Sequence, residues 1–228
     1  MTLDNKNFFK SRSLYKAPLS KRKALKIVES SYLAAATALI WIALYYLPIG
    51  GAVFRLALPL PLVLLQIRRG VKTGIEGVTI CVMLLTALMG PLRGPLVLFP
   101  YGLLSLWLGY SWQKGWNWWL SWSVGVSIGT MGFLIRVLVL SILLGENLWV
   151  ILTRAGAGLL EKGIDIFNLS FTPDMRQVQV VALFLIITQE IVYVLCLHAL
   201  AYWIFPRLKS SIPEPPALLE NLISLESN

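Results

Sequence analysis

The chain has 228 residues, of which 57% are hydrophobic and 14% charged, with a formal net charge of +9. Soluble domains carry about 25% charged residues, so the composition excludes an ordinary soluble domain and indicates a membrane protein. Eight basic residues precede the first long apolar segment: Lys6, Lys10, Arg12, Lys16, Lys21, Arg22, Lys23 and Lys26. This placement indicates that the positive charge binds lipid headgroups, and we expect no nucleic-acid partner.

Apolar segments of helical length then follow one another along the chain. About 20 apolar residues in a helix cross a hydrocarbon core about 30 Å thick. We place six membrane spans at residues 28–47, 52–67, 75–92, 96–112, 119–144 and 178–205. The sequence therefore predicts an all-α, polytopic bundle of about six spans. A basic arm (1–27) precedes the membrane domain (28–208), and a flexible tail (209–228) follows it.

The second span is short and contains Pro59 and Pro61. Proline removes a backbone donor, and lipid offers no replacement partner for the carbonyl that this leaves free. We therefore expect a broken or tilted segment packed inside the bundle. The turn Gly90–Pro95 separates the third span from the fourth. The alternative is that these two spans form one long hairpin.

The loops alternate between basic and neutral or mixed charge. Because short basic loops stay in the cytoplasm, the bias places both termini there and the Arg93 turn and the loop 145–177 on the outer side. Within that loop, apolar residues recur at helical spacing over 148–167. This spacing predicts an amphipathic helix that lies on the membrane or packs on its neighbours. The expected location is a bacterial-type cell membrane or an internal membrane such as the thylakoid.

Polar residues inside the spans mark the candidate ligand site. Arg136 lies deep in the fifth span, and Gln189 and Glu190 lie in the middle of the sixth. Two further charged candidates are Arg55, near the start of the second span, and Glu76, which opens the third. Charged groups within spans are costly and usually face the bundle interior or a wet cavity. Two interpretations remain open: Arg136 and Glu190 form a buried ion pair that fixes helix register, or they line a pocket for a small solute with Gln189.

The residues of known catalytic chemistry are missing. His198 is the single histidine, and Cys81 and Cys196 lie in apolar segments, so we expect no metal site. No recognisable nucleophile and base accompany one another, and no phosphate-binding loop of the Walker type occurs. We therefore expect a protein that is not an enzyme and needs no cofactor.

Small residues recur at spacing four in the first span, at Ser30, Ala34 and Ala38. Gly125 and Gly129 repeat this spacing in the fifth span. Such stripes allow two membrane helices to approach closely. They serve either internal packing or the docking of a partner subunit.

Together these features resemble the substrate-binding S components of energy-coupling-factor (ECF) vitamin transporters. The likeness lies in six spans, an irregular second span and the Ala34-x-x-x-Ala38 stripe. The run from Pro59 to Gly74, with Gln66-Ile67-Arg68-Arg69-Gly70-Val71-Lys72, is more closely similar to the YybS-like polytopic membrane proteins. The resemblance covers about residues 25–208. It implies that Ala34 and Ala38 contact a coupling transmembrane subunit, and it brings no ligand with it.

The predicted function is therefore that of an S-component-like transporter subunit. Such a subunit binds a small solute near the outer half of the bundle, with Arg136, Gln189 and Glu190 as ligand-binding residues, and a separate ATPase module drives transport. The alternative is a membrane scaffold or assembly factor for another membrane complex, which uses its basic arm to bind lipid headgroups or an acidic partner.

Overall fold

The computed structural model describes residues 20–166, 174–210, 212–214 and 216, and every regular element in these ranges is helical. The predicted all-α bundle is thus confirmed. The basic residues before residue 20 and the tail beyond residue 216 lie outside the described residues. The elements, in chain order, are α1 (Lys21–Tyr46), α2 (Gly51–Ala57), α3 (Leu60–Arg69), α4 (Val71–Met89), η2 (Pro95–Leu98), α5 (Tyr101–Gln113), α6 (Trp118–Leu144), α7 (Leu148–Ile166), α8 (Met175–Ile204) and η3 (Pro206–Leu208).

Five helical segments of the described chain are long and apolar enough to cross a membrane: α1, α2 with α3, α4, α6 and α8. The predicted span 96–112 has a different form, because it consists of the short η2 and the 13-residue α5. Pro100 explains the break. A residue before proline is driven out of the helical region, and Phe99 is accordingly extended, with φ −112° and ψ 120°. At about 1.5 Å per residue, α5 is about 20 Å long.

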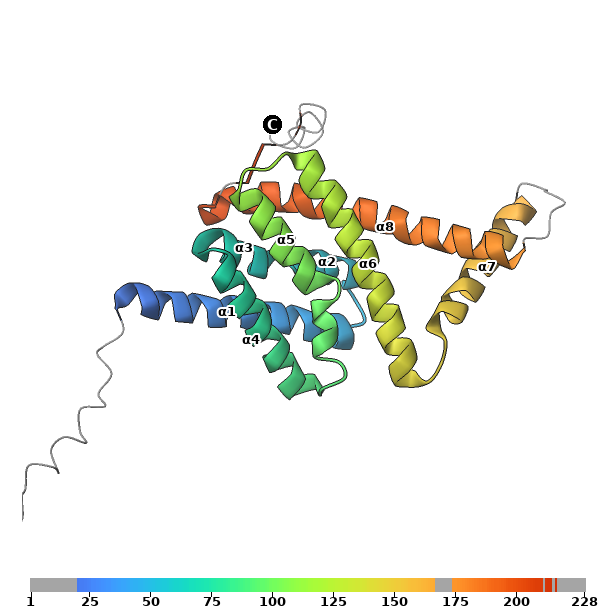
Figure 1. The fold of residues 1–228 in the computed structure, drawn as a ribbon, viewed down its shortest axis with the longest axis horizontal. Helices are drawn as coiled ribbons and strands as arrows, with labels where there is room; N and C mark the ends of the chain where they lie inside the picture. Colours follow the sequence, from blue (N-terminus) through green and yellow to red (C-terminus); the bar gives the residue numbers. More distant parts are fainter. Residues whose placement is uncertain (1–19, 167–173, 211, 215, 217–228) are drawn as a thin grey trace, which may run out of the picture.

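The beginning of α1 and the end of α8 meet at one end of the bundle. Arg68, at the end of α3, lies 3.0 Å (Nη1) from Oε1 of Glu29 in α1. The same guanidinium donates to the carbonyl of Leu208 and, over 3.3 Å, to the hydroxyl of Ser210. We call this the basic end, because Lys21, Arg22, Lys23, Lys26 and Arg69 also lie on helix ends there (Figure 1).

The predicted break in the second span is confirmed. Helix α2 ends at Ala57, and α3 begins at Leu60, directly after Pro59. Helix α3 is packed inside the bundle, since Val63 and Leu65 are fully buried in a core cluster with side chains of α5 and α8. A second cluster joins α1 and α4 around Ala34, Trp41, Cys81 and Leu85.

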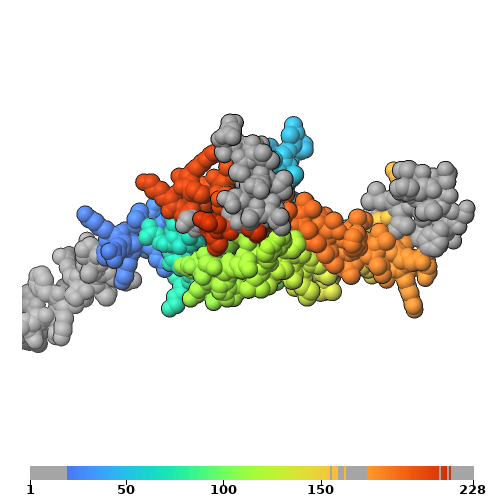
Figure 2. All heavy atoms as spheres, turned by 90° about the horizontal axis from the view of Figure 1, so that it is seen from above, coloured from blue at the N-terminus to red at the C-terminus, as the bar shows by residue number. Residues whose placement is uncertain are grey.

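The loop between α6 and α8 contains the predicted helix, α7, which packs against both of its neighbours. Helix α8 starts with a capping box, in which Asp174 and Gln177 exchange hydrogen bonds with each other's backbone N–H groups. The first part of α8, together with α7, extends beyond the rest of the bundle and gives the molecule an elongated shape (Figures 1 and 2).

Candidate functional site

The polar residues of α6 and α8 meet at a small cavity of about 50 Å³. Pro100 and Tyr101 contribute from the start of α5, and α2 contributes an arginine that lies far from the others in the sequence. The full lining consists of Arg55, Pro100, Tyr101, Phe133, Arg136, Gln189, Glu190 and Tyr193. The structure therefore brings Arg136, Gln189 and Glu190 together around one space.

The Arg136 guanidinium is held by aromatic groups of α1. Its Cζ lies 5.2 Å from the ring centroid of Trp41, and its Nη2 donates to the hydroxyl of Tyr45 over 3.0 Å. Trp41 in turn is completely buried. A guanidinium has five N–H donors in a planar fork, so this position orients the group while leaving donors for a ligand.

Glu190 is 5% exposed, and its Oε2 atom has no hydrogen-bond partner among the described residues. The carboxyl group packs against the α6 backbone at Gly129. A Cβ placed on Gly129 would lie 2.3 Å from this oxygen, so any larger residue would force the carboxyl group to shift. A buried polar group without a partner costs about 1–3 kcal/mol.

The ion pair between Arg136 and Glu190 is not formed. Among the described residues, salt bridges within 4.0 Å join only Lys26 to Glu76 and Glu29 to Arg68 and Arg69. The arginines and the carboxyl group therefore line the same cavity without forming an ion pair. Tyr193 lies beside them and donates to the backbone carbonyl of Arg55 over 3.0 Å, which ties α8 to α2.

Three tyrosines at or beside the cavity were missed in the sequence: Tyr45, Tyr101 and Tyr193. Tyr193 carries a usable signal, because it follows Glu190 by three residues and so lies on the same face of a helix. Tyr45 and Tyr101 come from other elements, and no local pattern connects them to Arg136. The cavity lies away from the basic end. Tyr45, which supports it, is near the last residue of α1, and Arg55, which lines it, belongs to α2.

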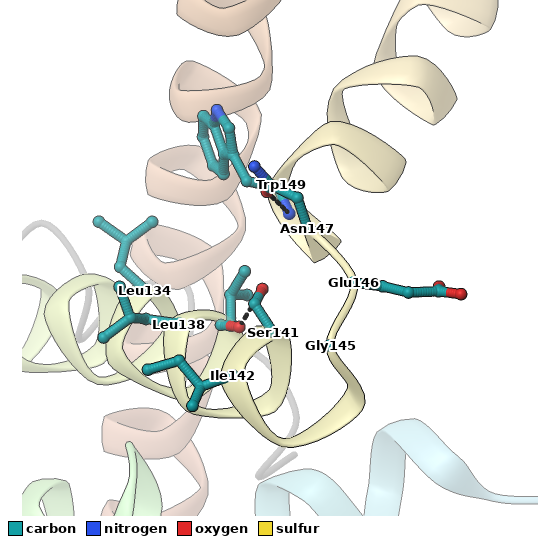
Figure 3. A pocket seen from close by; sticks show the side chains of 9 residues that line it. Leu134, Leu138, Ser141, Ile142, Gly145, Glu146, Asn147 and Trp149 are labelled. Atoms are coloured by element: carbon teal, nitrogen blue, oxygen red, sulfur yellow. Dashed lines mark hydrogen bonds between the residues drawn. The ribbon is translucent and has the colours of Figure 1, made fainter.

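A larger hollow of about 620 Å³ lies at the turn between α6 and α7. Aliphatic side chains such as Leu134, Leu138 and Ile142 line it, and the carboxylate of Glu146 points away from it (Figure 3). Ser141 uses its hydroxyl within the chain, where it accepts from Leu148 N over 3.0 Å. Because no charged groups converge here, the hollow suits lipid chains better than a polar solute.

The small residues of α1 are used inside the chain. Ala34 and Ala38 are 0% and 1% exposed and pack in the cluster with Trp41, Cys81 and Leu85. Their small size lets α4 approach α1 closely. In this arrangement neither side chain has surface left for a partner subunit, and internal packing accounts for the stripe.

His198 is fully buried in a satisfied polar chain. Its Nδ1 lies 2.8 Å from the carbonyl of Val194, and its Nε2 lies 3.1 Å from Oγ of Ser121, which is 2.8 Å from Oγ of Ser111. A carbonyl only accepts, so Nδ1 carries the proton and Nε2 accepts from Ser121. Within the described ranges, no group of three or more His, Cys, Asp or Glu side chains is arranged to hold a metal ion.

The family described as Predicted membrane protein (DUF2232) matches residues 34–221, which include every residue of the cavity. The chain belongs to this family. The DUF2232 match agrees with the apolar helices and supports an integral, multi-pass membrane protein that sits in lipid. A comparison with curated proteins and one with solved structures gave no match.

Proposed function

We propose that this DUF2232 protein is a non-enzymatic membrane protein that binds a small polar solute between α2, α6 and α8, as an S-component-like subunit of a transporter. The observation that carries the proposal is the buried Oε2 of Glu190, which faces a cavity bordered by two arginines and lacks a partner among the described residues. Charged groups at membrane depth are usually functional, because they are too costly to keep otherwise.

The surroundings of Arg136 support the same conclusion. Trp41 and Tyr45 hold the guanidinium in place, so the group is oriented before any ligand arrives. Preorganised groups bind more tightly, because the ordering cost is met when the protein folds. A merely structural arginine at this depth would be expected to pair with Glu190, the acidic group that lines the same cavity.

The resemblance to S components extends the proposal to transport. The energy would come from a separate ATPase module in the same membrane, and both termini would face the cytoplasm. The chain itself has no Walker-type phosphate loop, so it would serve as the solute-binding subunit.

The second candidate function is a scaffold or assembly factor. The observation in its favour is the concentration of positive charge at the basic end, where Arg68 and Arg69 already hold Glu29. Such a surface suits lipid headgroups or an acidic partner. This candidate predicts that deletion of residues 1–23 abolishes recovery of the partner, whereas Glu190→Gln has little effect.

The test is purification in mild detergent with native lipids, followed by mass spectrometry of the bound small molecules and proteins. We expect a stoichiometric metabolite in the wild type and its loss in Arg136→Gln. Arg93→Gln is the matched control, because Arg93 lies in the turn after α4 and outside the cavity. Recovery of other membrane assemblies with no metabolite would reject solute binding and favour the scaffold.

A further inference from the structure

The charges around the cavity do not balance. Arg55 and Arg136 contribute two positive charges, and Glu190 contributes at most one negative charge. The excess is therefore positive whether or not Glu190 carries a proton. A low-dielectric site with an uncompensated positive charge favours an anionic group, and an arginine fork matches a carboxylate in both shape and charge.

The unpartnered oxygen of Glu190 requires a second feature in the ligand. When Glu190 is ionised, its carboxylate only accepts hydrogen bonds, and Oε2 then needs an N–H or O–H donor. The side-chain amide of Gln189 also borders the space and provides both a donor and an acceptor. One small molecule with a carboxylate and a neighbouring donor would satisfy both ends of the cavity.

The cavity volume limits the size of this molecule. A water molecule occupies about 30 Å³ in the liquid, and drug-sized ligands need about 300–1,000 Å³. The space of about 50 Å³ lies far below the range for drug-sized ligands, so it restricts the ligand to a few non-hydrogen atoms, as in acetate or glycine, and in this conformation it excludes a vitamin.

We propose that the ligand is a small carboxylate with an adjacent amino or hydroxyl donor, an inference that rests on the proposed solute site. Arg136, assisted by Arg55, binds the carboxylate, and Glu190 accepts from the donor. The carboxylate sets the affinity through the arginines, and the donor sets the selectivity through Glu190.

The experiment measures binding of glycine, acetate and methylamine to the purified full chain in lipid nanodiscs, by equilibrium dialysis with radiolabelled probes. We expect glycine to bind more tightly than acetate and methylamine to bind worst. Arg136→Gln should weaken glycine about tenfold or more, since it removes a charged hydrogen bond. Glu190→Gln should reduce the preference for glycine over acetate and leave acetate binding nearly unchanged.

The Arg93→Gln variant is the matched control and should bind all three probes as the wild type does. Tighter binding of methylamine than of glycine would overturn the inference. So would a co-purified stoichiometric metabolite without a carboxyl group, although solute binding itself would then be supported. If no probe binds and no metabolite is retained, both the ligand class and the solute site are rejected.

Discussion

Gly129 allows the close approach of the Glu190 carboxyl group to α6. Its missing side chain leaves the space that the Glu190 carboxyl group occupies, since a Cβ would lie 2.3 Å from Oε2. We expect Gly129→Ala to lower the free energy of unfolding by about 1–3 kcal/mol, because the carboxyl group must move within a packed interior. Thermal unfolding in nanodiscs measures this change.

Gly158→Ala is the control for this substitution. Gly158 lies in α7, and a Cβ at this position would have no neighbour within 4 Å, so the new methyl group meets open space. Alanine favours a helix over glycine by about 1 kcal/mol, and Gly158→Ala should be neutral or stabilising. Equal destabilisation by both substitutions would show that the contact with Glu190 is not what makes Gly129 necessary.

Ser121 donates to Nε2 of His198, the one histidine of the chain, because the carbonyl of Val194 places the proton on Nδ1. We expect Ser121→Ala to destabilise the protein by about 1–3 kcal/mol, because Nε2 is then buried without a donor. Nitrogen NMR of labelled histidine should show a proton on Nδ1 in the wild type. Ser127→Ala, on the exposed face of α6, should change little, and a wild-type proton on Nε2 would contradict the assignment.

At the scale of elements, α3 and α4 pack through a pair of complementary sizes. A Cβ on Gly77 would lie 2.4 Å from Cδ2 of the fully buried Leu65. Gly77→Ala should cost about 1–3 kcal/mol and Leu65→Ala about 2–5 kcal/mol. The double variant should cost clearly less than the sum, because the added methyl group fills part of the space left by leucine. Chemical unfolding of the four proteins completes this cycle.

The comparison pair is Leu65→Ala with Gly158→Ala. Gly158 belongs to α7, which packs on α6 and α8, so the two effects should add within about 0.5 kcal/mol. If the effects of Gly77→Ala and Leu65→Ala on the free energy of unfolding were also additive, α3 and α4 would not pack through these two residues.

The sequence was informative wherever a local rule dominates. Pro59 predicted the break between α2 and α3, and the apolar spacing after residue 148 predicted α7. It was misleading where the outcome depends on distant groups. Arg136 turns to Tyr45 and Trp41 of α1 instead of Glu190, because their aromatic surface and hydroxyl lie within its reach. Likewise, the Ala34 and Ala38 stripe is consistent with any close neighbour, and only the packed bundle identifies that neighbour as α4.

For the whole molecule, the contacts that join the first part of α1 to the segment after α8 limit the number of membrane crossings. Arg68 links Glu29 of α1 to Leu208 after α8, so an even number of crossings must separate them. The five long helical segments need a sixth crossing, which α7 is poorly suited to provide because it contains Arg154, Glu161, Lys162 and Asp165. We therefore expect the short α5 to complete the sixth crossing, which would retain the six predicted spans with one in an unusual form.

This topology predicts opposite accessibility for the two ends of α6. In a background with Cys81→Ser and Cys196→Ser, we introduce Gln113→Cys before α6 or Glu146→Cys after it, both at exposed positions. Because the basic loops stay inside, a membrane-impermeant maleimide added to right-side-out vesicles should label position 146 and spare position 113 until detergent is added. Labelling of position 113 alone would mean that the protein has the opposite orientation in the membrane. Labelling of both positions in sealed vesicles would mean that α6 does not cross the membrane.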